Sequence, residues 1–261
     1  MITIENELLM DLRTFLKFMD LDCERLDVFW SSGAPLLFDQ EVEPIEFLKF
    51  SEDDLLRGDK QGLVNALTNA KRAIDSQIDK IFGCFGILKQ RNFPQKMQIL
   101  QDMGLVAPRI IVKVSKLRNL LEHEYKLPDK EQVEDAVDIA DLFVLALDSN
   151  LDNFPDTFYI RTFINDKKRK GDNELVFDKE VEINFDENEH KFVLEGYILD
   201  TDNFIEEHGR EYQKVVQKVG QVLLPATEQG YLQIIGIASK SAKPYNVKND
   251  VSKFVKMFNQ V

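Results

Sequence analysis

Apolar residues in the first half of the chain recur at steps of three and four, the spacing of one face of an α-helix. The first stripe consists of Leu8, Leu9, Leu12, Phe15, Leu16 and Met19. The same spacing continues through residues 55–82, 94–103, 108–126 and 129–148. Four helices with short links predict an antiparallel bundle. The stretch 30–50, with one glycine and two prolines, is predicted to be an irregular connector wrapped on that bundle.

Capping signals set the predicted ends of these helices. Ser51, followed by three acidic residues, is a typical N-cap with negative charge in the first turn. Gly58 and Gly62 weaken the opening of the long helix that follows. Pro108 suits the first turn of the third bundle helix, and Pro128 lies just beyond its end.

After the polar segment 148–156 the hydrophobic period changes, and short alternating runs predict strands at 158–164, 176–185 and 192–199. Helical spacing returns across 204–224 and 247–258, with an isoleucine-rich run at 231–238 between them. The predicted fold class is therefore α+β, an N-terminal antiparallel helical bundle followed by a small mixed α/β domain. Residues 1–50 would pack on the bundle, 51–150 would form it, and 151–261 would form the second domain.

Charge narrows the function classes. The formal net charge is -13 and the pI is about 4.8, so attraction to nucleic acid or anionic lipid is not an overall property and must be local. No apolar run is long enough to span a membrane, and the first 13 residues lack the basic and apolar regions of a secretory signal. Cys23 and Cys84 are too few and too far apart for a disulfide framework. A cytoplasmic protein without membrane contact is expected.

The few histidines limit the possible chemistry. The chain has three, His123, His190 and His208, and lacks the H-E-x-x-H, C-x2-C and G-x-S-x-G patterns. Neither a metal site nor a cofactor is predicted. Paired acids are frequent but are expected to form solvated surfaces, and the last two histidines lie among glutamates in the same way.

One constellation stands apart, near the end of the third bundle helix. Arg118, Asn119, His123 and Tyr125 lie within eight residues. On an ideal helix Asn119 and His123 share a face, whereas Arg118 lies about 140° from His123. A site built from both is completed most naturally where the same helix of a second subunit supplies the missing side.

The surrounding sequence is basic in an otherwise acidic chain. Residues 89–118 contain seven Lys or Arg residues and a single acid. Arg109, Lys113 and Lys116 form one stripe that continues to His123, so it could direct a phosphodiester towards the histidine. An exposed basic face without a ligand is the alternative. For His123 alone, a surface imidazole near a helix C-terminus is the alternative, and for Tyr125 an ordinary bundle residue.

These residues resemble the HEPN superfamily, whose members carry R-x4-6-H at the end of the third helix of a bundle. Tyr125 extends the match to the R-x4-H-x-Y form of HepT-like toxins, in which a partner nucleotidyltransferase modifies the tyrosine. The resemblance covers about residues 51–148. It implies a metal-independent endoribonuclease that acts as a homodimer through the third helix, with RNA as substrate and a protein antitoxin or modifying enzyme as a further partner.

The side chains are consistent with that chemistry. A ribose 2′-hydroxyl would attack phosphorus, His123 would move the proton, Arg118 would stabilise the phosphoryl charge and Asn119 would orient the phosphate. DNA lacks this nucleophile and should be spared. Glu122 and Glu124 oppose the chemistry because they repel phosphate.

Two other functions stay open. One is a non-catalytic HEPN-like module that docks a protein or nucleotide. The other is a toxin-antitoxin or phage-defence component whose second domain senses a trigger. In that domain the basic run 167–170 could contact RNA, although a solvated hairpin tip is the commoner explanation of such a run.

Overall fold

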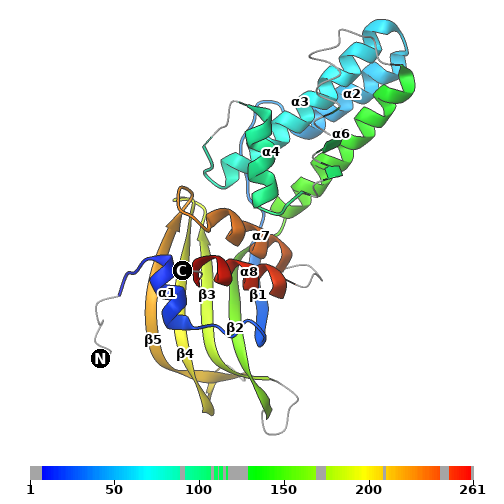
Figure 1. Ribbon diagram of the computed structural model, residues 1–261. Coiled ribbons are helices and arrows are strands. Elements are labelled where there is room, and N and C mark those ends of the chain that lie inside the picture. Colours follow the sequence, from blue (N-terminus) through cyan, green and yellow to red (C-terminus); the bar gives the residue numbers. More distant parts are fainter. Residues whose placement is uncertain are drawn as a thin grey trace. The chain divides into compact units, whose positions relative to one another are not determined.

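The computed structural model describes residues 8–88, 92–106, 109–110, 112–113, 116, 129–168, 175–207, 210–241 and 247–259. The chain forms two compact units (Figure 1). One, the sheet unit, contains Met1–Ala34 and Phe154–Val261; the other, the helical unit, contains Pro35–Asn153. The fold is mixed α and β, as the change of hydrophobic period predicts.

The sheet unit is built on a five-stranded antiparallel sheet in the order β1-β2-β3-β4-β5. Its strands are β1 (Leu26–Ala34), β2 (Phe154–Lys168), β3 (Leu175–Asp186), β4 (Lys191–Glu207) and β5 (Arg210–Pro225). Because β1 pairs directly with β2, with Ala34 opposite Phe154, the whole helical unit is inserted between two neighbouring strands.

Three helices cover one face of this sheet: α1 (Leu12–Met19), α7 (Tyr231–Ser241) and α8 (Lys248–Asn259) (Figure 1). Alternate strand residues are buried against them, including Phe158 and Ile160, Val181 and Ile183, and Phe192 and Leu194. Gly196 allows α1 to approach closely, because a Cβ there would lie 2.5 Å from the Met19 sulfur and 2.9 Å from the Phe15 ring.

The helical unit contains α2 (Pro44–Arg57), α3 (Lys60–Cys84), α4 (Phe93–Asp102) and α6 (Lys130–Leu151). Asp59 caps α3 by accepting a hydrogen bond from the Gly62 amide, and Asp129 with Gln132 forms a capping box on α6. The Lys80 ammonium, near the end of α3, contacts both Glu43 and Asp148. The start of α2 and the ends of α3 and α6 therefore lie together. Thus α2 runs antiparallel to α3, whereas α3 and α6 run in the same direction (Figure 1). The predicted antiparallel arrangement is therefore wrong for the first and last helices of the bundle, because Lys80 joins their C-terminal ends.

Several predicted elements are confirmed. The helices at 94–103 and 129–148 correspond to α4 and α6, and the strands at 158–164, 176–185 and 192–199 lie in β2, β3 and β4. The polar segment 148–156 contains the junction between the units. The helix predicted at 108–126 falls mostly outside the described residues, although those described between 109 and 116 are helical.

Other predictions are wrong in instructive ways. Residues 55–82 form two helices instead of one, because Gly58 adopts φ 66° and ends α2. The stretch 30–50 is not an irregular connector, since it holds the end of β1 and the start of α2. Residues 204–207 and 210–224 form strands where a helix was predicted. The isoleucine-rich run 231–238, for which the sequence predicted no element, is helical.

The predicted domain limits also differ at the N-terminus. Residues 1–50 were expected to pack on the bundle, but α1 and β1 belong to the sheet unit. The physical reason is that Phe15, Leu16 and Met19 bury the apolar face of α1 in the core of the sheet unit, where the ring of Phe15 meets Gly196. The strand pairing of β1 with β2 completes the assignment.

Candidate functional site

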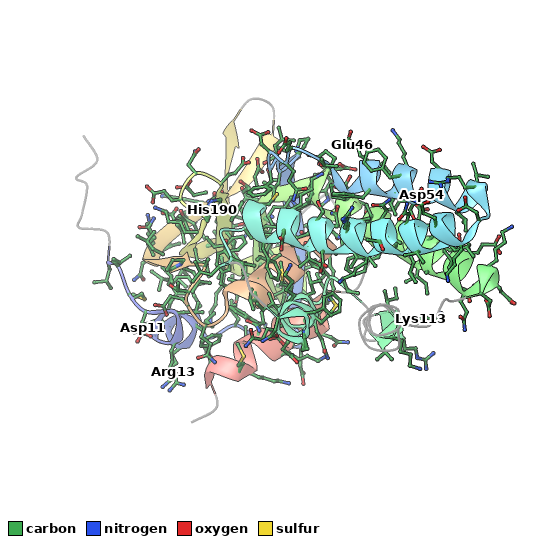
Figure 2. The ribbon with its side chains drawn as sticks, turned by 90° about the horizontal axis from the view of Figure 1, so that it is seen from above. Asp11, Arg13, Glu46, Asp54, Lys113 and His190 are labelled. Carbon is green, nitrogen blue, oxygen red and sulfur yellow. The ribbon has the colours of Figure 1, made fainter. Side chains whose placement is uncertain are left out.

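The four motif residues Arg118, Asn119, His123 and Tyr125 lie outside the described residues, as does His208. The basic stripe that precedes them is described. Arg109, Lys113 and Lys116 all occupy helical positions and are all exposed (Figure 2 labels Lys113). Their spacing of four and three residues places them on one helix face. The structure thus shows the three residues exposed at helical positions, and their role in binding stays a prediction.

Lys96 departs from the basic surface expected for residues 89–118. It lies on the inward face of α4, only 7% exposed, and its ammonium is 2.6 Å from the Asp79 carboxylate on α3. This ion pair anchors α4 to α3. Lys96 is therefore a structural residue and does not belong to a phosphate-binding surface.

Lys80 forms a second polar anchor. Its ammonium lies 3.0 Å from Asp148 and 3.3 Å from Glu43. Burial alone lowers the pKa of Lys80, but the hydrogen bonds and charges of the two carboxylates outweigh it and raise the pKa overall. The lysine stays charged and holds three segments of the helical unit at one end.

Gln77 is the polar side chain of α3 that the fold leaves unsatisfied. It is 0% exposed, and neither its amide nitrogen nor its amide oxygen has a hydrogen-bond partner. A buried amide without partners costs about 1–3 kcal/mol.

We expect Gln77→Leu to raise the free energy of unfolding of the helical unit by about 1–2 kcal/mol, because leucine has a similar volume and needs no partner. Hydrogen exchange of the α3 amides in wild type and variant measures this change. The exposed Gln61→Leu serves as the control and should shift it little. A loss of stability in Gln77→Leu would mean that the amide has a partner in solution.

The sheet unit carries a polar network that the sequence reading missed, on the face opposite its three helices. The Arg161 guanidinium lies 5.3, 5.1 and 5.2 Å from the ring centroids of Phe29, Tyr159 and Phe177, and its Nε donates to Glu180. These residues come from three adjacent strands. The one sequence signal for this cluster is the alternation along β2. Ile160 is buried, so Tyr159 and Arg161 on either side of it are expected on the opposite face of the sheet.

On the neighbouring strands, the Tyr197 hydroxyl donates to Glu195 at 2.5 Å, and Lys218 and Gln221 each donate to the same carboxylate at 2.8 Å. Burial, followed by the hydrogen bond and charge of Glu195, raises the pKa of Tyr197 well above its usual value. Burial opposes ionisation of Glu195, yet the three donors lower its pKa overall. Near neutral pH Tyr197 therefore stays protonated and Glu195 stays ionised. The network is suited to a structural or binding role and not to proton transfer.

A groove of about 530 Å³ lies between the start of α1, the end of β5 and α8. Leu12, Leu224 and Phe258 form part of its apolar lining, with Arg13 and Glu228 among its charged residues (Figure 2 labels Arg13). Asp11 is occupied as the N-cap of α1, accepting hydrogen bonds from the Thr14 amide and hydroxyl. The groove could hold a small ligand, but its lining has no serine, threonine, cysteine, lysine or histidine.

The remaining sequence candidates give no site. His190 adopts φ 47° in the turn between β3 and β4, and its buried Nδ1 has no hydrogen-bond partner (Figure 2). Lys167 and Lys168 end β2, whereas Arg169 and Lys170 fall outside the described residues. Among the described side chains, no group of three or more His, Cys, Asp or Glu could hold a metal ion. Within the same part of the chain, no helix has the length and hydropathy needed to cross a bilayer.

Comparisons with protein-family models, with curated proteins and with solved structures found no match to this chain. Function must therefore be inferred from the residues themselves.

Proposed function

We propose that this chain is a metal-independent endoribonuclease of HEPN type, in which Arg118, Asn119 and His123 act on RNA bound along the helical unit. The observation that carries the proposal is the basic stripe. Arg109, Lys113 and Lys116 are exposed on one helix face, directly before the motif, in a chain whose net charge is -13. A row of positive charges in an acidic protein attracts a polyanion to one place, here next to the candidate residues that follow the stripe in the sequence.

The proposed reaction uses the substrate's own nucleophile. The ribose 2′-oxygen bonds to the adjacent phosphorus as the bond to the 5′-oxygen breaks, which yields a 2′,3′-cyclic phosphate and a free 5′-hydroxyl. His123 accepts the 2′-proton or protonates the leaving oxygen, and Arg118 neutralises charge on the non-bridging oxygens. Asn119 orients the phosphate. No step requires a metal ion or cofactor.

The active form in this proposal is a cytoplasmic homodimer in which the motif helices of two copies face each other. The angle of about 140° between Arg118 and His123 supports this arrangement, because one helix cannot present both to one phosphate. Tyr125 is the candidate for modification by a partner enzyme, and a protein antitoxin is the candidate regulator.

The direct test incubates the full chain in EDTA with a labelled single-stranded RNA and with DNA of the same sequence. We expect RNA to be cleaved to products that end in a cyclic phosphate, and DNA to stay intact because it lacks the 2′-hydroxyl. Gel electrophoresis with end-group analysis measures both. Cleavage of DNA at a similar rate would rule out the proposed nucleophile.

Substitution of the stripe should weaken RNA binding before it affects the chemistry. We expect Lys113→Glu with Lys116→Glu to raise the dissociation constant for RNA at least tenfold and to reduce its salt dependence. Lys49→Glu with Lys60→Glu is the matched control, because it makes the same charge change at exposed positions elsewhere in the helical unit. Fluorescence anisotropy over a salt series measures both variants. An equal loss of RNA affinity in the control would show that the effect comes from the change in net charge and not from the stripe.

The competing proposal is a non-catalytic module that docks a protein or nucleotide. The overall acidic charge and the positions of Glu122 and Glu124 beside His123 favour it. Under this proposal wild type leaves RNA intact in EDTA.

A further inference from the structure

The outward face of α6 differs in character along its length. Its exposed stripe consists of Glu131, Glu134, Asp135, Asp138, Leu142 and Leu145. These positions recur at three and four residues and so share one side of the helix. The opposite side, which includes Val133, Val137, Ala140, Val144 and Leu147, is buried in the helical unit.

The apolar end of the stripe holds two exposed leucines on one helix face. Leu142 is 65% exposed and Leu145 is 51% exposed, one turn apart on the same face. Elsewhere along α6 the large apolar residues at core positions are buried, so the helix already has a complete core face. The two leucines therefore form a second apolar surface that the described part of the helical unit leaves exposed.

The acidic end is only partly neutralised. Lys130 lies 3.2 Å from Glu134, and within the described part of the chain no ion pair is found for Glu131, Asp135 or Asp138. The helix dipole accounts for Glu131 in the first turn, but its effect fades within one turn and does not account for Asp135 or Asp138. The like charges of Asp135 and Asp138 therefore destabilise the helix by repulsion, and no interaction described within the helical unit offsets this.

We propose that this stripe is a docking surface for a basic amphipathic helix of another protein. Charge complementarity selects the partner, whose lysines or arginines would face Asp135 and Asp138 while its apolar residues cover Leu142 and Leu145. From residue 131 to 145 the stripe is about 21 Å long at 1.5 Å per residue, which matches one partner helix of about four turns. This inference goes beyond the proposed nuclease function and does not depend on it.

The probe is a fluorescent helical peptide of about 16 residues, with lysines on one face in one half, leucines on the same face in the other half, and alanine and glutamine elsewhere. A second peptide has the same composition but scattered positions, so it has the charge without the face. We expect the full chain to bind the first peptide at least tenfold more tightly than the second, measured by anisotropy at physiological ionic strength.

Two variants test the two ends of the stripe. Asp135→Lys with Asp138→Lys, and separately Leu142→Gln with Leu145→Gln, should each weaken peptide binding about tenfold or more. The matched control is Glu52→Lys with Asp53→Lys, an equally exposed acidic pair on α2, which should change binding less than about twofold. Circular dichroism verifies that all variants keep their helices.

Three results would overturn the proposal. Equal binding of both peptides, or an equal loss in the α2 control, would reduce the interaction to general charge attraction. Self-association of wild type that the leucine variant abolishes, seen by sedimentation, would assign the surface to a second copy. RNA cleavage in the same variants should match wild type, which separates failure of the docking surface from failure of the nuclease.

Discussion

His123→Ala is expected to lower the rate of RNA cleavage by about 10²–10⁴-fold, the usual contribution of a group that transfers a proton in the transition state. The reason is that neither an alkoxide attacking nor an alkoxide leaving is stable at neutral pH without such a group. Single-turnover kinetics in EDTA, with enzyme in excess over labelled RNA, isolates the chemical step from binding.

The controls for this variant use the chain's own residues. His190→Ala removes a histidine from a turn of the sheet unit and should leave the rate unchanged. Arg118→Lys keeps the charge but loses the planar fork, so it should reduce the rate while retaining part of the activity. Cleavage by His123→Ala at the wild-type rate would contradict the proposed chemistry even if RNA still binds.

The second large effect concerns stability. Asp79→Ala is expected to lower the free energy of unfolding of the helical unit by about 3–5 kcal/mol, because it leaves the buried Lys96 ammonium without its carboxylate. Lys96 shares the buried face of α4 with Phe93, Met97 and Leu100, and its side chain is 9% exposed. Denaturant unfolding followed by hydrogen exchange at α4 measures the loss.

The double variant Asp79→Ala with Lys96→Met provides the decisive comparison. Methionine has a similar shape to lysine without the charge, so the double variant should recover most of the lost stability. Asp53→Ala, at an exposed position of α2, should change stability by less than about 0.5 kcal/mol. If the double variant is as unstable as Asp79→Ala, an unpaired charge is not the cause.

Local periodicity predicted the elements whose packing is local. In α6 the spacing predicted most apolar residues of the core face, although not Ala136 or Leu151, and Asp129 marked the start of the helix. The end of α2 at Gly58 was readable as a weak point but not as a break, since glycine is tolerated within some helices.

The second half of the β4–β5 hairpin was mistaken for a helix for a definite reason. Val215, Val216, Val219 and Val222 fall at helical spacing, although β-branched residues favour strands. Pairing with β4, in which Leu199 lies opposite Val215, decides the outcome. The periodicity of a short stretch of sequence carries no information about which strands pair.

Long-range pairing also explains the misplaced N-terminal domain limit and the missed network on the sheet. Arg161 meets Phe29 and Phe177 only because β1, β2 and β3 align in register. The proposed active site, by contrast, depends on residues that are close together in the sequence. The motif was identified from sequence, since its residues lie within eight positions. Of its surroundings, the structure shows Arg109, Lys113 and Lys116 exposed at helical positions.

The insertion of the helical unit between paired strands affects how the chain can fold during synthesis. Arg25 meets Phe163 across a separation of 138 residues, so the first strand leaves the ribosome long before its ladder partner exists. The helical unit is continuous in sequence and can fold in that interval. During the same time the apolar surfaces of α1 and β1 lack the strands against which they pack. The sheet unit is therefore expected to fold slowly and only after the helical unit and the later strands have been synthesised, and a nascent chain halted before β2 would be a target for chaperones.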